Sequence, residues 1–157
     1  MARQYRTFVL ILLTAFASRV LFLTNESLWR DEVDAIRFAF EPIGDVLGRF
    51  SISGFNGPLY HLALRAWLSA AGVSDFALRY FSAFFGVLLI ALIHIVGARM
   101  FGARAGTIAA WLATASPILT WYAGEGKMYS LQPALLTFAI YALLRATSAA
   151  RRTAGWW

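Results

Sequence analysis

Four long apolar stretches separated by short polar segments form the main pattern of the chain. They cover residues 8–24, 80–98, 105–122 and 128–144, and the last three contain no Lys, Arg, Asp or Glu. A helix that crosses about 30 Å of hydrocarbon needs roughly 17 to 25 mostly apolar residues, because it rises about 1.5 Å per residue. The pattern therefore predicts an all-α, polytopic membrane protein with about four transmembrane helices.

Residues 25–79, between the first two predicted spans, contain shorter helical patterns. Residues 34–40 suit a short surface helix that ends before Pro42, and residues 43–50 suit another. A third piece, residues 57–71, starts at Gly57-Pro58 and ends before Gly72. We expect this outer loop to lie on the membrane surface, because it carries aromatic residues that suit the headgroup level: Trp29, Phe38, Phe40, Tyr60 and Trp67.

The distribution of charge predicts which side of the membrane each loop faces. Arg and Lys concentrate in cytoplasmic loops. Four crossings with a cytoplasmic N-terminus place these residues in the cytoplasm: Arg3, Arg6, Arg99, Arg104, Arg145, Arg151 and Arg152. All eight Asp and Glu residues then lie outside, and both termini lie inside. A fifth crossing at residues 57–71 would turn the later arginines outward, so we predict four.

The composition agrees with a membrane protein. The chain has 157 residues, 60% of them hydrophobic and 14% charged, which is too apolar for an ordinary soluble domain. The net charge of +6 therefore reflects the cytoplasmic bias of arginine, and we expect no nucleic-acid partner. The absence of cysteine excludes disulfides and thiolate metal sites.

The first apolar stretch has one alternative interpretation. Arg3 and Arg6 precede it, and Ala15-Phe-Ala17 resembles the cleavage site of a signal peptide. The apolar run continues through Leu23 to spanning length, which favours a transmembrane helix. With either interpretation, Asp31 emerges on the outer side.

Three carboxylates, Asp31, Glu32 and Asp34, lie close together at the start of the outer loop. In one interpretation, Asp31 caps a helix and Asp34 completes a pair that resembles a capping box. In the other, Asp31 and Glu32 provide a base or a metal ligand at the outer membrane face. Adjacent residues on a helix point about 100° apart, so one of the two should be primary, and we choose Asp31.

Four motifs in order carry a family resemblance. They are Ser27-Leu-Trp-Arg-Asp-Glu-Val-Asp34, Gly57-Pro-Leu-Tyr-His-Leu62, Phe76-Ala-Leu-Arg-Tyr-Phe-Ser-Ala83, and the stretch from Ala115 to Leu131 that contains Trp-Tyr-Ala-Gly-Glu-Gly-Lys-Met-Tyr. Together they resemble the N-terminal part of the polytopic GT-C glycosyltransferases. The closest patterns are those of the family 39 enzymes related to protein mannosyltransferases and to the lipid A aminoarabinose transferase.

This resemblance implies a function and a location. Such enzymes transfer a sugar from a polyprenyl-phosphate carrier to a glycan, lipid or protein acceptor on the outer side of the membrane, here the bacterial plasma membrane and the cell envelope. The acidic residue of the family's first outer loop, often followed by Glu, corresponds to Asp31 and Glu32. Asp31 is thus the candidate base, with Glu32 as the second candidate catalytic residue.

Cations are needed to stabilise the departing phosphate, and three are candidates. Arg19 lies inside the first span, where an unpaired guanidinium is costly unless it faces a cavity or snorkels to the headgroups. Arg79 either contacts phosphate or anchors the second span at the interface. Lys127 stands where related enzymes often have Arg, in Glu-Ala-Arg-Met-Tyr, so Gly126 and Lys127 depart from that pattern.

The remaining candidates for substrate binding are Glu125, Tyr129 and His61. Glu125 and Lys127 are alternatively an exposed ion pair of little energetic value. His61 is alternatively packed or directed at headgroups. We predict no cofactor, although Asp31 and Glu32 could contribute oxygen ligands to a divalent metal ion.

Enzymes of this family are usually several times longer. We therefore expect residues 1–157 to form the N-terminal portion of a GT-C domain, or a partial enzyme whose activity alone is doubtful. The alternative from another functional class is a small, non-catalytic four-helix membrane protein that acts as a subunit or assembly partner.

Overall fold

The computed structural model describes residues 2–21, 23–52 and 57–154. Every regular element within these residues is a helix, which confirms the predicted all-α class. Four helices lie in the predicted apolar stretches: α1 (Ala2–Val20), α5 (Asp75–Phe101), α6 (Ala103–Thr114) and α8 (Leu131–Ala154).

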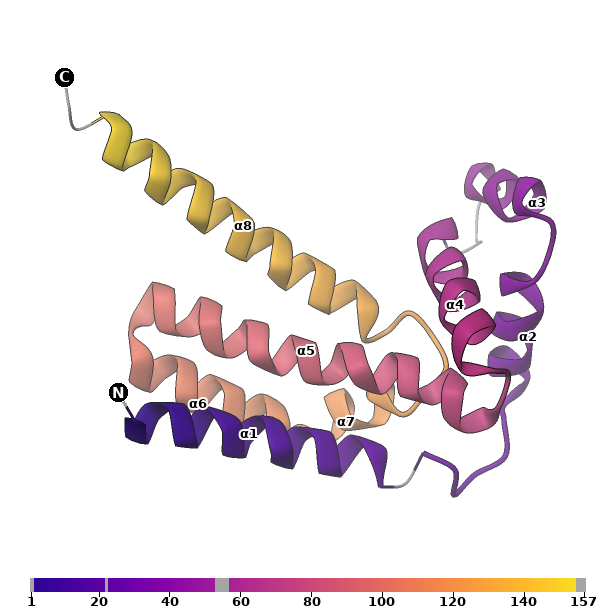
Figure 1. Cartoon of the computed structure of the whole chain (residues 1–157), viewed down its shortest axis with the longest axis horizontal. Coiled ribbons are helices and arrows are strands. Elements are labelled where there is room, and N and C mark those ends of the chain that lie inside the picture. Colours follow the sequence, from indigo (N-terminus) through magenta and orange to yellow (C-terminus); the bar gives the residue numbers. More distant parts are fainter. Residues whose placement is uncertain (1, 22, 53–56, 155–157) are drawn as a thin grey trace.

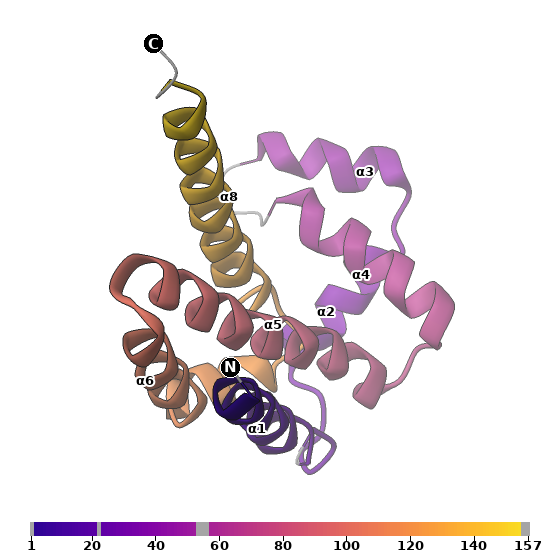
Figure 2. The same cartoon turned by 60° about the vertical axis from the view of Figure 1, so that its left-hand side comes forward.

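The helices α1, α5 and α6 run alongside one another, as Figure 1 shows. The turn between α5 and α6 lies at the same end of the molecule as the N-terminal end of α1. The helix α8 begins beside α5, and its C-terminal part points away from the other helices, which Figure 2 shows from another side. The outer-loop helices gather at the opposite end, so the two ends of the molecule differ in structure.

The predicted spans agree only in part with these helices. Within the described residues, α5 alone is long and apolar enough to cross a membrane by length and composition. The helix α5 thus extends beyond both ends of the second predicted span, residues 80–98. The first and fourth spans, predicted over residues 8–24 and 128–144, agree only in part with α1, which ends at Val20, and with α8, which begins at Leu131. Both helices include arginines within their length. The four crossings therefore remain a prediction.

The third span, predicted as one helix over residues 105–122, is wrong in this form. The chain forms two helices there, α6 and the short α7 (Pro117–Ala123). The break lies at Ser116, because Pro117 has no backbone N–H to donate and disfavours a helical residue before it. The Ser116 hydroxyl instead accepts a hydrogen bond from the backbone N–H of Leu119, which starts α7.

The outer loop contains the three predicted helices. They are α2 (Arg30–Ala39), α3 (Ile43–Gly48), which a short 3₁₀ turn at Arg49–Ser51 extends, and α4 (Pro58–Ala71). The helix α2 begins earlier than the predicted residue 34. Its start therefore includes Asp31 and Glu32 in the first turn.

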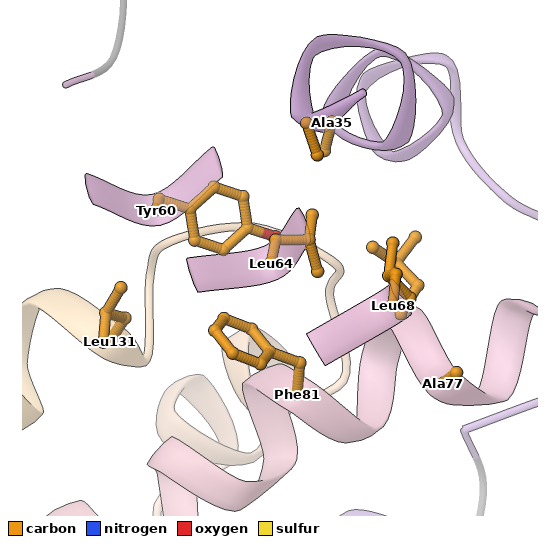
Figure 3. Packing of buried hydrophobic residues seen from close by; sticks show 9 residues of the cluster. Ala35, Tyr60, Leu64, Leu68, Ala77, Phe81 and Leu131 are labelled. Atoms are coloured by element: carbon orange, nitrogen blue, oxygen red, sulfur yellow. The ribbon is translucent and has the colours of Figure 1, made fainter. Parts of the chain in front are cut away.

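A hydrophobic cluster joins α2 and α4 to α5 and the start of α8. Figure 3 shows its members from four helices: Ala35 of α2, Tyr60, Leu64 and Leu68 of α4, Ala77 and Phe81 of α5, and Leu131 of α8. Leu64 and Leu68 are almost completely buried, so α4 is held through its apolar face. Through this packing α2 lies on α4, and α4 lies on α5. The packing therefore determines where the acidic first turn of α2 lies.

Candidate functional site

A buried ion pair joins α2 to α5. Glu32 and Arg79 are both almost inaccessible to solvent, with exposed fractions of 2% and 4%. Arg79 Nε donates to Glu32 Oε1 at 2.9 Å, and Arg79 Nη2 donates to Glu32 Oε2 at 2.7 Å. This parallel pair of hydrogen bonds is the geometry in which a guanidinium binds a carboxylate most strongly.

Glu32 also accepts two backbone hydrogen bonds. The N–H of Gly126 donates to Glu32 Oε1 at 2.7 Å, and the N–H of Trp29 donates to Oε2 at 3.0 Å. Burial alone raises the pKa of Glu32. The hydrogen bond from Arg79, those from Gly126 and Trp29, and the charge of Arg79 outweigh burial, so the pKa lies below its ordinary value. Glu32 is therefore a fixed anion.

Arg79 has no N–H left for another ligand. In addition to Glu32, its Nη1 donates to the carbonyl oxygens of Leu23 and Glu26, both at 2.7 Å, and its Nη2 donates to Ser27 at 3.1 Å. These contacts use all five guanidinium donors. They fix the chain between α1 and α2, and a phosphate contact by Arg79 would have to displace one of them.

Two cavities meet beside this ion pair. The larger, of about 460 Å³, is lined by residues of α1, α7 and the following loop, among them Arg19, Thr120 and Trp121. The smaller, of about 280 Å³, is lined by Asp31, Lys127, Tyr129 and Arg30. Trp29, Glu32 and Glu125 line both cavities and form their shared wall.

Asp31 lines only the smaller cavity, and its carboxylate is exposed. The interpretation that Asp31 caps the helix is wrong, because the residue that caps α2 is Trp29 and Asp31 lies inside the helix. Glu32, the third residue of α2, accepts a hydrogen bond from the backbone N–H of Trp29, as the third residue of a capping box does. Within the described residues, the Asp31 carboxylate has no hydrogen-bond or ion-pair partner. It is thus free to accept a proton from a bound molecule.

Arg19 lines only the larger cavity and is 3% exposed. Its Nη1 donates to the carbonyl of Ala15 and to the hydroxyl of Ser18, both at 3.2 Å, and its Nη2 to Ala113 at 3.4 Å. Its Nε is buried without a hydrogen-bond partner, and no carboxylate of the described chain pairs with it. The guanidinium therefore keeps its positive charge unneutralised at the cavity wall.

Glu125 and Lys127 do not pair with each other in the described structure. Glu125 Oε1 instead accepts a hydrogen bond from the indole N–H of Trp121 at 2.6 Å. Lys127 lines the smaller cavity, and its carbonyl accepts a hydrogen bond from the Ser82 hydroxyl at 3.0 Å. Tyr129 lines the same cavity, and its ring lies 4.8 Å from that of Tyr122.

His61 lies apart from both cavities. It is buried at 7% exposure, and its ring contacts the edges or faces of Phe38 and Tyr60, with centroids 5.9 and 5.4 Å away. Burial is the main cause that lowers its pKa, and the positive charges of Lys127 and Arg49 add to it. These contacts correspond to the packed alternative for His61.

The sequence interpretation missed three contributors to the site. Trp121 and Thr120 line the larger cavity, and the Gly126 N–H holds Glu32. The break before Pro117 is the signal in the sequence for the first two, because it ends the predicted span and starts α7, which carries both residues. In the described residues, no group of three or more metal-binding side chains is found.

Comparison with known families gives one match. A family model described as dolichyl-phosphate-mannose-protein mannosyltransferase matches residues 56–157. No curated protein and no solved structure matches the chain. The matched region includes Arg79, Glu125 and Lys127, and the ion pair with Glu32 ties the preceding segment to it. This family is of the GT-C glycosyltransferase type, which the motifs of the chain resemble. The chain therefore belongs to the dolichyl-phosphate-mannose-protein mannosyltransferase family.

Proposed function

We propose that this protein is the N-terminal portion of, or a partial version of, a membrane glycosyltransferase. It transfers a sugar from a polyprenyl-phosphate carrier to an acceptor at the extracytoplasmic face. One observation carries the proposal: the free carboxylate of Asp31 and the unneutralised guanidinium of Arg19 line two cavities that share one wall. The acceptor is a glycan, a lipid or a protein.

The smaller cavity suits the acceptor. An acceptor hydroxyl there transfers its proton to the Asp31 carboxylate as its oxygen attacks the anomeric carbon of the sugar. The new glycosidic bond forms while the bond from that carbon to the phosphate oxygen breaks. The bonding electrons leave with the carrier phosphate, which gains one negative charge. Tyr129 and Lys127 stand at the same cavity to position the acceptor.

The larger cavity suits the donor phosphate. Its walls include the end of α1 and the start of α7, and Arg19 supplies the positive charge that stabilises the departing phosphate. The guanidinium of Arg19 is paired with no carboxylate of the described chain, so its charge is available to such an anion. The prenyl tail remains in the bilayer beside these helices.

Glu32 and Arg79 serve as positioning residues in this scheme. They neutralise each other and hold α2, the first loop and the Gly126 turn together. This arrangement keeps Asp31 at the cavity, and the charges of Glu32 and Arg79 do not take part in substrate binding. We place the acidic end on the outer side of a bacterial plasma membrane, with several crossings and both termini in the cytoplasm.

The experiment is a transfer assay in membranes that contain the complete reading frame, with polyprenyl-phosphate sugars as donors. Asp31→Asn should lower the rate of sugar transfer by about 10²-fold or more, because it removes the general base. The matched control is Asp34→Asn, since Asp34 lies on the same helix and lines neither cavity.

The comparison also tests the alternative, a non-catalytic subunit. Transfer that survives Asp31→Asn in correctly inserted protein would contradict the catalytic role and favour that alternative. An equal loss of transfer in Asp31→Asn and Asp34→Asn would show that removing any negative charge from α2 lowers transfer. That result would also contradict a specific base at position 31.

A further inference from the structure

Two tryptophan rings stand exposed at the larger cavity. Trp29 precedes α2 and is 61% exposed, and Trp121 of α7 is 57% exposed. Both line this cavity, together with the polar side chains of Asn25 and Thr120. The opening thus combines aromatic faces with groups that can form hydrogen bonds.

The indole of Trp121 is fixed by its own hydrogen bond. Its N–H donates to Glu125 Oε1 at 2.6 Å, and Glu125 is another residue of the cavity wall. A tryptophan that anchors a protein at the membrane interface directs its N–H toward headgroups and water. In Trp121 this N–H is already bound to Glu125, so a headgroup contact does not explain its orientation.

Trp29 is fixed through its backbone. Its N–H donates to Glu32 Oε2 at 3.0 Å, and Glu32 is held in turn by Arg79 and Gly126. The ring therefore extends from a rigid point in the wall that both cavities share. This is where the sugar lies if the phosphate is at Arg19 and the acceptor is at Asp31.

We propose that Trp29 and Trp121 form the binding subsite for the sugar ring of the donor. One face of a hexose ring presents C–H groups whose hydrogens carry partial positive charge, and the face of an indole carries partial negative charge. The two faces therefore attract each other. The hydroxyl groups at the edge of the sugar reach Asn25 and Thr120. The inference rests on the proposed function. It adds that the two tryptophans distinguish a carrier that bears a sugar from a carrier that does not.

The test compares two ligands on the full chain in lipid nanodiscs. The probes are geranylgeranyl phosphate and geranylgeranyl phosphate mannose, since the family description names mannose. Trp121→Leu and Trp29→Leu should each weaken binding of the mannose-bearing probe by about five- to tenfold, and Trp→Phe at each position by less, because the aromatic face remains. Binding of the bare phosphate should change by less than about twofold.

The control variant is Phe138→Leu, which removes an exposed aromatic ring of α8 that lines neither cavity. It should leave both affinities unchanged. Equal weakening of both probes by the tryptophan variants would overturn the sugar subsite, as would no weakening of either, and both results leave the proposed function standing. A wild-type protein that binds neither probe would overturn the proposed function together with the inference.

Discussion

Glu32 and Asp31 are neighbours in sequence but have opposite surroundings. The carboxylate of Glu32 accepts four hydrogen bonds, two from Arg79 and two from backbone N–H groups, and is almost fully buried. The carboxylate of Asp31 accepts none within the described chain and faces a cavity. A carboxylate so strongly bound is a poor base, whereas a free one can accept a proton. In the proposed function, chemistry and positioning are thus divided between these adjacent residues.

Glu32→Gln should destabilise the protein by about 3 to 5 kcal/mol at neutral pH, because it leaves the buried guanidinium of Arg79 uncompensated. The folded-state pKa of Glu32 lies below the ordinary value of 4.5, so its contribution to stability is present above that pH and is lost as the pH falls through the lowered pKa. The stability difference between wild type and variant should therefore shrink below pH 4.5. Unfolding in detergent, followed from pH 7 downward, measures this difference.

Asp31→Asn is the matched control for that measurement. The carboxylate has no partner to lose, so its stability should change by less than about 0.5 kcal/mol. A difference between wild type and Glu32→Gln that stays constant at all pH values would contradict the assigned ionisation of Glu32.

Gly126 is a second residue whose surroundings explain its identity. A Cβ atom at this position would lie 2.5 Å from Cγ of Leu78, which is fully buried. In this chain the Leu78 side chain occupies the space that an Ala methyl group would need.

Gly126→Ala should therefore destabilise the protein by about 1 to 3 kcal/mol through overpacking. Leu78→Ala alone should also destabilise it, by about 2 to 5 kcal/mol, because it leaves a cavity. In the double variant the new methyl group occupies part of that cavity. A thermodynamic cycle measured by thermal unfolding should give a total cost well below the sum of the two, and strict additivity would count against the contact.

At the scale of elements, the interruption between α6 and α7 decides the shape of the larger cavity. Apolar composition over residues 105–122 predicted one continuous span, and composition alone does not reveal the interruption. Pro117 was visible in the sequence, but proline is also tolerated inside transmembrane helices when neighbouring groups satisfy the freed carbonyls. The short outer helices were predicted more accurately, because Pro42, Gly57-Pro58 and Gly72 mark their limits.

The approach of α5 to α1 and α7 depends on Gly86. A Cβ atom there would lie 2.7 Å from the Cβ of Ala123 and 3.3 Å from Cδ and Nε of Arg19. Gly86→Ala should separate these helices and displace Arg19. We expect both a loss of about 1 to 3 kcal/mol in stability and weaker binding of a polyprenyl phosphate.

Gly44→Ala provides the control at this scale. Gly44 lies in α3, and nothing comes within 4 Å of a Cβ atom at that position. The substitution should stabilise the helix by about 0.5 to 1 kcal/mol, because alanine loses less backbone entropy on folding. Gly86→Ala should lower both thermal stability and phosphate binding, whereas Gly44→Ala should raise thermal stability and leave phosphate binding unchanged. Unchanged phosphate binding in Gly86→Ala would argue against the role of Arg19.

For the molecule as a whole, the pattern of apolar runs predicts which segments become helices but not which side chains meet. The family motifs singled out Glu32, Arg79 and the loop around Gly126 separately. Their contacts join residues 47 and 94 positions apart, and no local periodicity encodes such pairs. Helical geometry predicts only that one of Asp31 and Glu32 is primary. In the structure Glu32 is buried and Asp31 is exposed, and Asp31 as the base stays a prediction.

The asymmetry of the whole molecule leads to a test of its orientation. The acidic outer helices lie at one end, and the α5–α6 turn, with Arg99 and Arg104 beside it, lies at the other. If the arginine bias sets the topology, these ends face opposite sides of the membrane.

The chain has no cysteine, so a single introduced thiol can be labelled without background from other thiols. Asp45→Cys in α3 and Arg104→Cys in α6 both replace exposed residues outside the two cavities. In intact cells, a membrane-impermeant maleimide should modify the thiol at position 45, and it should modify that at position 104 only after permeabilisation. Labelling of position 104 in intact cells would place the two ends on the same side or reverse them, and Asp31 would then have no access to an extracytoplasmic acceptor.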